Sequence, residues 1–77
     1  MGKQRLLMIE DAPVEARLGI AYLRSEPYEV HHVLTGQAGL NFLSENAVDV
    51  VLLDLNLPDM GGFEILEWIR DRELPVA

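Results

Sequence analysis

Hydrophobic residues in this chain occur either in short runs rich in apolar residues or at every third or fourth position. The runs cover residues 5–9, 28–34 and 48–53, and apolar runs of this length are typical of strands in a parallel sheet. The second run contains polar residues and suits an edge strand, whereas the third run is the most apolar and is expected to be buried on both faces. Strands that alternate with helical stretches predict an α/β fold with right-handed crossover connections.

Capping and turn residues bound three expected helices. Asp11 and Thr35 are suitable N-caps for the first two, and Pro13 is tolerated in a first helical turn. The first helix is expected to begin at residues 12–13 and end at 25–27, the second to end at 44–46, and the third to run from the turn at 58–62 to residues 70–72. Apolar residues at helical spacing predict the buried face of each helix. In the first helix they are Val14, Leu18 and Ala21, with Ala16, Ile20 and Leu23 widening the apolar stripe. In the second helix they are Ala38, Leu40, Phe42 and Leu43, and in the third they are Phe63, Leu66 and Ile69.

Several other residues receive simpler interpretations. Trp68 lies beside the third helical stripe and is either a half-buried cover or an exposed contact for a partner, of which the second is favoured. Residues 74–77 are expected to begin a fourth strand. Asp59 is expected to serve only its turn, and the adjacent His31 and His32 should face opposite sides of a strand, which argues against a metal-binding pair.

Composition narrows the classes of function. The 77 residues are expected to form one domain, residues 1–77, and a net charge of −7 argues against a nucleic-acid surface or a polybasic membrane patch. The absence of cysteine excludes disulfides and thiolate zinc sites. No apolar run approaches the ~18–20 residues that span a membrane, and the first residues lack a signal-peptide core, so a cytoplasmic location is expected.

Acidic residues follow two of the expected strands. Glu10 and Asp11 end the first strand, and Asp54 ends the third. If these strands are neighbours in a parallel sheet, the three carboxylates converge at one edge and repel one another unless a cation neutralises them. Hard oxygen ligands suit Mg²⁺, which commonly binds together with phosphate, and an aspartate beside it can attack phosphorus. Taken alone, Glu10 and Asp11 would more often cap a helix, and Asp54 would more often be a turn residue.

Two motifs resemble the receiver domain of bacterial two-component response regulators. They are Leu6-Leu7-Met8-Ile9-Glu10-Asp11 and Leu53-Asp54-Leu55-Asn56-Leu57-Pro58-Asp59-Met60-Gly61-Gly62. The resemblance implies a flavodoxin-like, receiver-type parallel sheet with strand order 2-1-3. It also implies that Asp54 accepts a phosphoryl group from a histidine kinase or phosphotransfer protein. Glu10 and Asp11 would hold Mg²⁺, one directly and one largely through water, with the backbone carbonyl of Asn56, while Pro58 and Gly62 would shape the adjacent loop.

The chain departs from this family pattern after its third helix. The resemblance implies a fourth and a fifth strand, with a hydroxyl residue and a lysine at their ends, and this sequence stops where the fourth strand should run. Coupling of phosphorylation to an output surface is therefore not expected of these residues alone. The third strand would become an exposed edge, so a dimer or higher oligomer is expected. The simplest form is a homodimer with strand order 2-1-3-3′-1′-2′, and the alternative is a swapped arrangement in which the residues after Pro75 reach across to a partner.

Three classes of function follow. The first is a signalling module that accepts phosphate on Asp54 and is not itself an enzyme. The second is a receiver-derived half-domain that self-assembles without phosphorylation. The third is a phosphatase of the haloacid dehalogenase type, which is disfavoured because that family needs a second aspartate two residues after the nucleophile, and position 56 is Asn.

Overall fold

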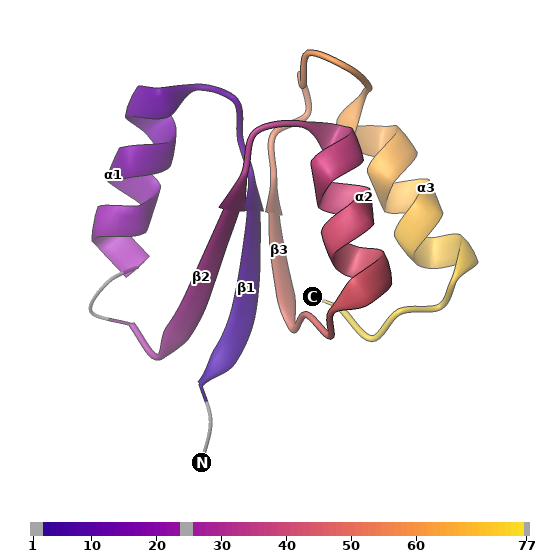
Figure 1. Cartoon of the computed structure of the whole chain (residues 1–77), viewed down its shortest axis with the longest axis horizontal. Helices are drawn as coiled ribbons and strands as arrows, with labels where there is room; N and C mark the ends of the chain where they lie inside the picture. The colour runs from indigo at the N-terminus through magenta and orange to yellow at the C-terminus, as the bar shows by residue number, and fades with distance from the viewer. Residues whose placement is uncertain (1–2, 24–25, 77) are drawn as a thin grey trace.

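Four consecutive buried residues, Leu6 to Ile9, place β1 (Gln4–Ile9) at the centre of a parallel three-stranded sheet. The computed structural model describes residues 3–23 and 26–76 (Figure 1). β1 pairs with β2 (Tyr28–Val33) on one side and with β3 (Val50–Leu53) on the other, and both pairs are parallel. The order β2-β1-β3 confirms the predicted flavodoxin-like arrangement of three βα units.

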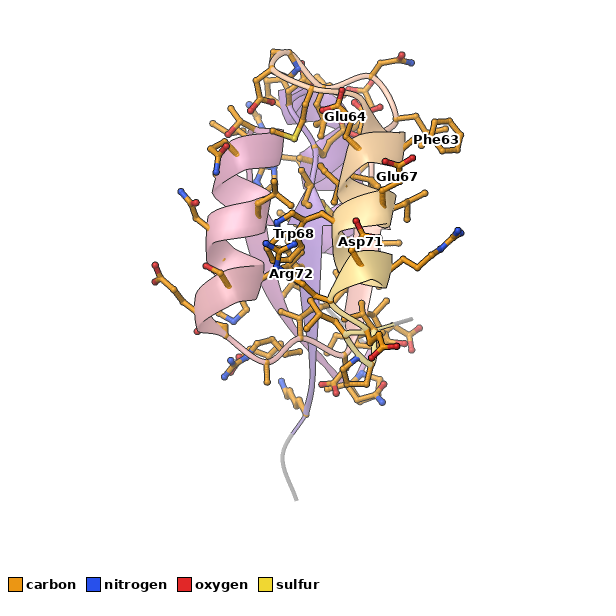
Figure 2. The ribbon with its side chains drawn as sticks, turned by 90° about the vertical axis from the view of Figure 1, so that its right-hand side faces the viewer. Phe63, Glu64, Glu67, Trp68, Asp71 and Arg72 are labelled. Carbon is orange, nitrogen blue, oxygen red and sulfur yellow. The ribbon has the colours of Figure 1, made fainter. Side chains whose placement is uncertain are left out.

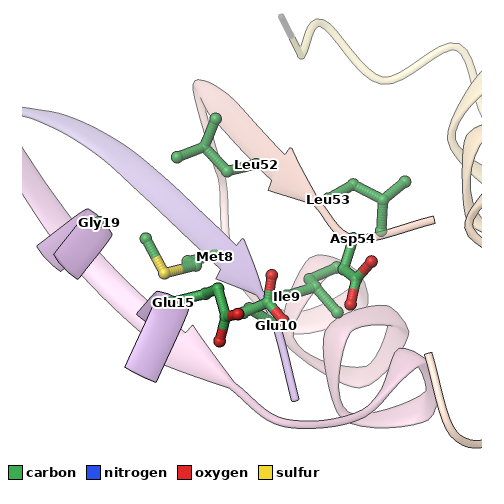
Figure 3. A pocket seen from close by; sticks show the side chains of 8 residues that line it. All are labelled: Met8, Ile9, Glu10, Glu15, Gly19, Leu52, Leu53 and Asp54. Atoms are coloured by element: carbon green, nitrogen blue, oxygen red, sulfur yellow. The ribbon is translucent and has the colours of Figure 1, made fainter. Parts of the chain in front are cut away.

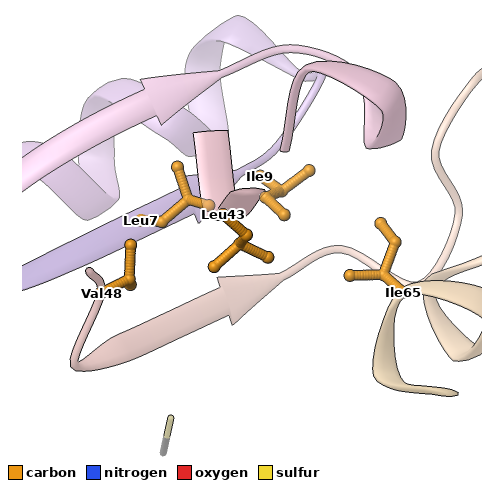
Figure 4. Close-up of a cluster of buried hydrophobic side chains, with 5 residues drawn as sticks. All are labelled: Leu7, Ile9, Leu43, Val48 and Ile65. Atoms are coloured by element: carbon orange, nitrogen blue, oxygen red, sulfur yellow. The ribbon is translucent and has the colours of Figure 1, made fainter. Parts of the chain in front are cut away.

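Helices cover both faces of this sheet, as Figure 1 shows. α1 (Pro13–Leu23) lies on one face, while α2 (Gly36–Glu45) and α3 (Gly62–Asp71) lie on the other. Because side chains alternate along a strand, Leu6 and Met8 point toward α1, and Leu7 and Ile9 point toward α2 and α3. The core on the α1 side is Leu6, Met8, Ala16 and Leu23, and the core on the opposite side is Leu7, Ile9, Leu43, Val48 and Ile65 (Figure 4).

The expected start of α2 is confirmed. The Thr35 hydroxyl accepts a hydrogen bond of 3.1 Å from the Ala38 amide, as an N-cap residue does. Leu43 is buried, and Leu40 and Phe42 are partly buried against the same core. The apolar spacing therefore predicted the buried face of α2 correctly.

The predicted face of α1 was partly right, because the buried side is the one formed by Ala16, Ile20 and Leu23. Val14 and Leu18 are 63% and 67% exposed, whereas Ala16 and Leu23 are buried and Ile20 packs beside them. Positions 16, 20 and 23 follow helical spacing as well as 14, 18 and 21 do, so periodicity alone left two apolar faces to choose between. In the folded protein, Ala16 and Leu23 form one core cluster with Leu6 and Met8 of the sheet.

The buried face of α3 also differs from the predicted one. Ile65 is fully buried, whereas Phe63 and Leu66 are 68% and 44% exposed, and Ile69 is partly buried. Figure 2 shows Phe63 pointing away from the body of the protein. The turn at 54–61 determines how α3 meets the sheet, and helical spacing carries no information about that turn.

Trp68 is a partly buried cover rather than the exposed contact that was expected. It packs against the core on the α2 and α3 side. The guanidinium carbon of Arg72 lies 3.9 Å from the ring centroid of Trp68, a cation–π contact from the next turn of the chain (Figure 2). Glu64, Glu67 and Asp71 occupy exposed positions of the same helix.

β3 is shorter and more exposed than the apolar run suggested. The strand begins at Val50, and the buried Val48 precedes it. Leu52 is 43% exposed, because β3 has β1 on one side and, within residues 3–23 and 26–76, no strand on the other. Residues 74–76 are not a strand, which corrects the predicted fourth strand, and residue 77 lies outside the described residues.

The expected end of α1 at 25–27 lies partly outside the described residues, and Leu23 is the last helical residue in the described range. In the part of the chain that the structure describes, no helix combines the length and the hydrophobicity that crossing a membrane requires.

Candidate metal and phosphoacceptor site

Backbone hydrogen bonds join the carboxyl ends of the three strands just beyond the last residue of β1. The amide of Glu10 donates to the carbonyl of Val33 at 3.1 Å, which ties the first residue after β1 to the end of β2. The amide of Asp54 donates to the carbonyl of Ile9 at 3.0 Å, which ties the first residue after β3 to the end of β1. The two acidic residues are therefore held at one edge of the sheet, where α/β proteins bind ligands.

Three carboxylates meet at this edge, as the sequence predicted. One side-chain oxygen from each of Glu10, Asp11 and Asp54 lies within 4.8 Å of the others. Glu10 and Asp54 are partly buried, and Asp11 is exposed. Three like charges at this spacing repel one another, so a bound cation would stabilise the arrangement.

Two of the carboxylates are oriented by the chain itself. Glu10 Oε1 accepts a hydrogen bond of 3.0 Å from the Ala12 amide, and Asp54 Oδ1 accepts one of 3.0 Å from the Asn56 amide. In each case the donor lies two residues further along the chain, so the local backbone turn fixes one oxygen. The second oxygen of each carboxylate remains able to bind a metal ion or to attack phosphorus.

The donor set fits Mg²⁺. It consists of carboxylate oxygens, the hard ligands that this ion prefers, and Mg²⁺ usually keeps several of its waters. The ion pairs formed by described residues join Glu29 to Arg5 and to His31, and neither involves the three carboxylates of this edge. Charge neutralisation at the site would thus come from a bound ion.

A cavity of about 260 Å³ adjoins the carboxylates (Figure 3). Its acidic lining residues are Glu10, Glu15 and Asp54. Its remaining lining is Met8, Ile9, Gly19, Leu52 and Leu53. A water molecule occupies about 30 Å³ of the liquid, so the space beside Asp54 accommodates a hydrated ion.

Asp59 does more than serve its turn, which corrects the simpler interpretation. Its two carboxylate oxygens accept hydrogen bonds from the amides of Gly36 (2.8 Å) and Gln37 (2.9 Å), at the N-terminus of α2. These backbone donors lower the pKa of the Asp59 carboxyl below its usual value, with Gln37 the larger contributor. The loop after the candidate acceptor is therefore attached to the first turn of α2, a contact between residues far apart in the sequence that no local motif indicates.

The lowered pKa of Asp59 predicts how stability depends on pH. Because the folded protein favours the charged carboxylate, the stabilisation is complete above the unfolded pKa of about 4 and is lost as the pH falls through the folded value. We expect Asp59→Asn to melt at a lower temperature than the wild type at pH 7, and the difference to shrink steadily as the pH falls below about 4. Thermal unfolding by circular dichroism across this range measures both effects, and a difference that is independent of pH would contradict the assignment.

Gly62, the first residue of α3, is enclosed by the backbone of the acceptor loop. Its amide donates to the Leu55 carbonyl at 3.1 Å. A Cβ at position 62 would lie 2.8 Å from Leu55 Cα and 3.0 Å from the Asp54 carbonyl oxygen. The adjacent Gly61 has no heavy atom within 4 Å of such a Cβ, and its φ of −77° suits any residue.

We expect Gly62→Ala to destabilise the protein by about 1–3 kcal/mol, because the obstructing atoms belong to the backbone and cannot rotate away. Gly61→Ala is the matched control and should change stability by no more than about 0.5 kcal/mol, since a small loss in N-cap preference opposes a gain in chain rigidity. Urea unfolding measures the stability of the two variants. Equal unfolding midpoints would show that the acceptor loop shifts to accommodate a Cβ at position 62 and would contradict the prediction.

The remaining predicted site residues lie on the same loop. Pro58 is exposed in a bend, and Asn56 is exposed and forms an isolated bridge with Gly61. The metal-binding role of the Asn56 carbonyl stays a prediction.

These features define an α/β protein with an acidic site at the carboxyl edge of a parallel sheet, and comparison with known proteins identifies its family. The family model for the response regulator receiver domain matches residues 6–77. The chain belongs to the response regulator receiver domain family.

Among curated proteins, the chain is 39% identical over 66 residues to the cell cycle response regulator CtrA of Brucella ovis, covering 86% of this chain and 28% of that protein. It is 38% identical over 65 residues to the sensor histidine kinase RcsC of Salmonella typhimurium, covering 84% of this chain and 7% of that protein. The chain thus spans a minor part of both relatives.

Solved structures show the same fold. The receiver domain of a LuxO repressor protein from Vibrio parahaemolyticus matches with a TM-score of 0.93 and 36% identity, over 97% of this chain and 58% of that one. A second match is the co-crystal structure of the histidine phosphotransfer protein Ypd1 of Saccharomyces cerevisiae with the receiver domain of its downstream response regulator Ssk1. Its TM-score is 0.84 and its identity is 28%, over 94% of this chain and 50% of that one.

Proposed function

We propose that this protein is a phosphoacceptor of two-component signalling, and that Asp54 receives the phosphoryl group. The observation that carries the proposal is the meeting of Asp54 with Glu10 and Asp11 within 4.8 Å at the carboxyl edge of the sheet. Membership of the receiver family supports it, and so does the solved pairing of Ssk1 with a phosphotransfer protein. The proposed donor is a phosphohistidine on a histidine kinase or a phosphotransfer protein.

In the proposed transfer, an Asp54 carboxylate oxygen bonds to phosphorus while the N–P bond of the phosphohistidine breaks. The electron pair of that bond returns to the imidazole, and the product is an acyl phosphate. Mg²⁺, held by Glu10, Asp11, Asp54 and the backbone carbonyl of Asn56, would neutralise charge on the transferring oxygens. The hydrogen bond from the Asn56 amide to Asp54 Oδ1 restrains the carboxylate, and its other oxygen would be the one that attacks phosphorus.

Asp54 is consumed as an acceptor in this scheme, so the protein is not proposed to be an enzyme that turns over a separate substrate. A cytoplasmic location and the absence of nucleic-acid contact stay predictions from composition.

Incubation with acetyl phosphate and Mg²⁺, followed by intact mass spectrometry, tests the proposal. We expect the mass of one added phosphoryl group on the wild type, loss of the adduct in Asp54→Asn, and loss of the adduct when EDTA removes the metal. Asp59→Asn is the matched control, because it alters a carboxylate of the same loop that is already bonded to backbone amides, and it should still be modified. An adduct that persists in Asp54→Asn would overturn the assignment.

We further propose a second function, in which the 77-residue polypeptide self-associates through β3. The observation that favours it is the position of β3 at the edge of the described sheet. β3 pairs with β1 alone among the described residues, and Leu52 on it is 43% exposed. An exposed apolar edge strand is a template for pairing with another chain, and two-fold symmetry would join β3 to its copy.

Light scattering at tens of micromolar should therefore report a dimer or larger species, and Leu52→Lys should shift it toward the monomer, because an edge lysine opposes strand pairing. A folded monomer of the wild type would exclude self-association. A dimer that acquires no phosphoryl adduct would favour the assembly function over the phosphoacceptor.

A further inference from the structure

His32, near the end of β2, contacts the backbone of a residue in the acidic site. In the β1–β2 pairing, His32 lies opposite Met8 and Val33 lies opposite Ile9. The His32 ring reaches beyond this register, and its Nε2 lies 2.8 Å from the backbone carbonyl oxygen of Glu10. A carbonyl oxygen only accepts hydrogen bonds, so Nε2 carries the proton and donates it.

Both backbone polar groups of Glu10 are therefore bonded to β2. Its amide donates to the Val33 carbonyl at 3.1 Å, and its carbonyl accepts from the His32 ring. Glu10 follows the last residue of β1, where the regular strand ladder stops. The imidazole of His32 thus supplies a hydrogen-bond donor to the Glu10 carbonyl, beyond the end of the regular strand pairing.

This attachment constrains the direction in which the Glu10 side chain leaves the backbone. Glu10 Oε1 is bonded to the Ala12 amide, and an oxygen of Glu10 lies within 4.8 Å of oxygens from Asp11 and Asp54. If the peptide unit after Glu10 rotates, it moves Asp11 directly and changes the hydrogen bond to Ala12. One ring on β2 therefore restrains two of the three carboxylates.

We propose that His32 is a positioning residue for the metal site, holding the Glu10 peptide so that Glu10 and Asp11 present their oxygens to a divalent cation together. This inference rests on the magnesium site of the proposed function and adds to it a residue outside the acidic motifs. Hydrogen bonds that orient metal ligands typically affect metal affinity even though they do not touch the ion.

The test compares three variants at one pH: His32→Ala, His32→Gln and His31→Ala. His32→Ala removes the donor, whereas His32→Gln keeps an amide Nε2 that reaches about as far from the backbone as the imidazole Nε2. His31→Ala is the matched control, because His31 is the adjacent histidine of the same strand and its Nε2 lies 2.8 Å from Glu29, not from the site. Thermal unfolding first establishes that each variant is folded.

Mg²⁺ titration followed by ¹H–¹⁵N NMR should show about two- to tenfold weaker binding for His32→Ala, the loss expected for one hydrogen bond. Binding by His32→Gln and His31→Ala should stay within about twofold of the wild type, since neither change removes the donor to Glu10. Rescue by neutral glutamine distinguishes the hydrogen bond from a charge effect of the imidazole. Wild-type affinity in His32→Ala would overturn the inference, and so would failure of His32→Gln to restore binding.

A readout without metal separates this inference from the proposed function. In the metal-free protein, hydrogen exchange at the Ala12 amide, which is bonded to Glu10 Oε1, should be faster in His32→Ala than in the wild type and unchanged in His31→Ala. Faster exchange in a protein that never binds Mg²⁺ would support the restraint by His32 while refuting the magnesium site. Unchanged exchange together with intact Mg²⁺ binding would refute the role of His32 alone.

Discussion

Replacing Asp54 by asparagine should weaken Mg²⁺ binding by about tenfold or more and should raise the melting temperature of the metal-free protein. Two unit charges about 4 Å apart interact by about 1 kcal/mol in water and about 4 kcal/mol near a protein surface, and 1.4 kcal/mol is tenfold in affinity. Asp54 contributes one of three carboxylate oxygens that lie within 4.8 Å of one another. Removing its charge therefore weakens attraction for a divalent ion and relieves repulsion when no ion is bound.

Asparagine preserves the shape of the side chain and still accepts a hydrogen bond from the Asn56 amide, so the loop should keep its conformation. Calorimetric titration with Mg²⁺ measures the affinity, and thermal unfolding with EDTA or excess Mg²⁺ measures the linked stability. At a concentration about 100 times the dissociation constant, Mg²⁺ should stabilise the wild type by about 2.7 kcal/mol, and tenfold weaker binding by the variant should remove about half of this gain.

Asp71→Asn is the control for the change in net charge. Asp71 ends α3, far along that helix from the acceptor loop (Figures 1 and 2). Its replacement should leave Mg²⁺ affinity unchanged. If Asp54→Asn binds Mg²⁺ as tightly as the wild type, or melts at a lower temperature without metal, the three carboxylates do not form the electrostatic unit described above.

Ile65→Ala should lower the free energy of unfolding by about 2–5 kcal/mol, the loss expected when a fully buried isoleucine is truncated. Ile65 is fully buried and belongs to the same core cluster as Leu7, Ile9, Leu43 and Val48 (Figure 4). Removing its outer atoms loses contacts on the α3 side of the core and leaves a cavity. At about 0.05–0.15 kcal/mol per residue, a protein of this length is stable by roughly 4–12 kcal/mol, so the variant retains only part of its stability.

Phe63→Ala is the matched control on the same helix. Phe63 is 68% exposed, so its truncation should change stability by about 0.5 kcal/mol or less despite the larger side chain. Urea unfolding of both variants with Trp68 fluorescence as the signal tests the orientation of α3. A greater loss from Phe63→Ala than from Ile65→Ala would mean that α3 packs with the face that its spacing suggested.

The sequence predicted the acidic site because strand ends are local features. Glu10 and Asp54 each interrupt an apolar run, and a parallel sheet brings the carboxyl ends of its strands to one edge. Recognising the first and third strands was therefore enough to predict that the carboxylates at their ends lie close together. The same reasoning predicted Thr35 as the cap of α2, since an N-cap bonds within its own first turn.

Helix orientation was not predictable in the same way. Val14 and Leu18 are as apolar as Ile20 and Leu23, and all four fit helical spacing. Which face is buried depends on the sheet that the helix meets and on the connection that brings it there. The contact between Asp59 and the amides of α2 is likewise non-local, because it joins residues more than twenty positions apart.

The positions of the chemically important acids therefore follow from the order of residues, since each acid stands where a strand must end. How those acids are held is a property of the packed molecule. His32 bonds to Glu10 only because β1 and β2 pair in parallel at one register, and Gly62 is required only because α3 begins against Leu55 and Asp54. These contacts join separate strands and loops, and they form only when the folded sheet brings those segments together.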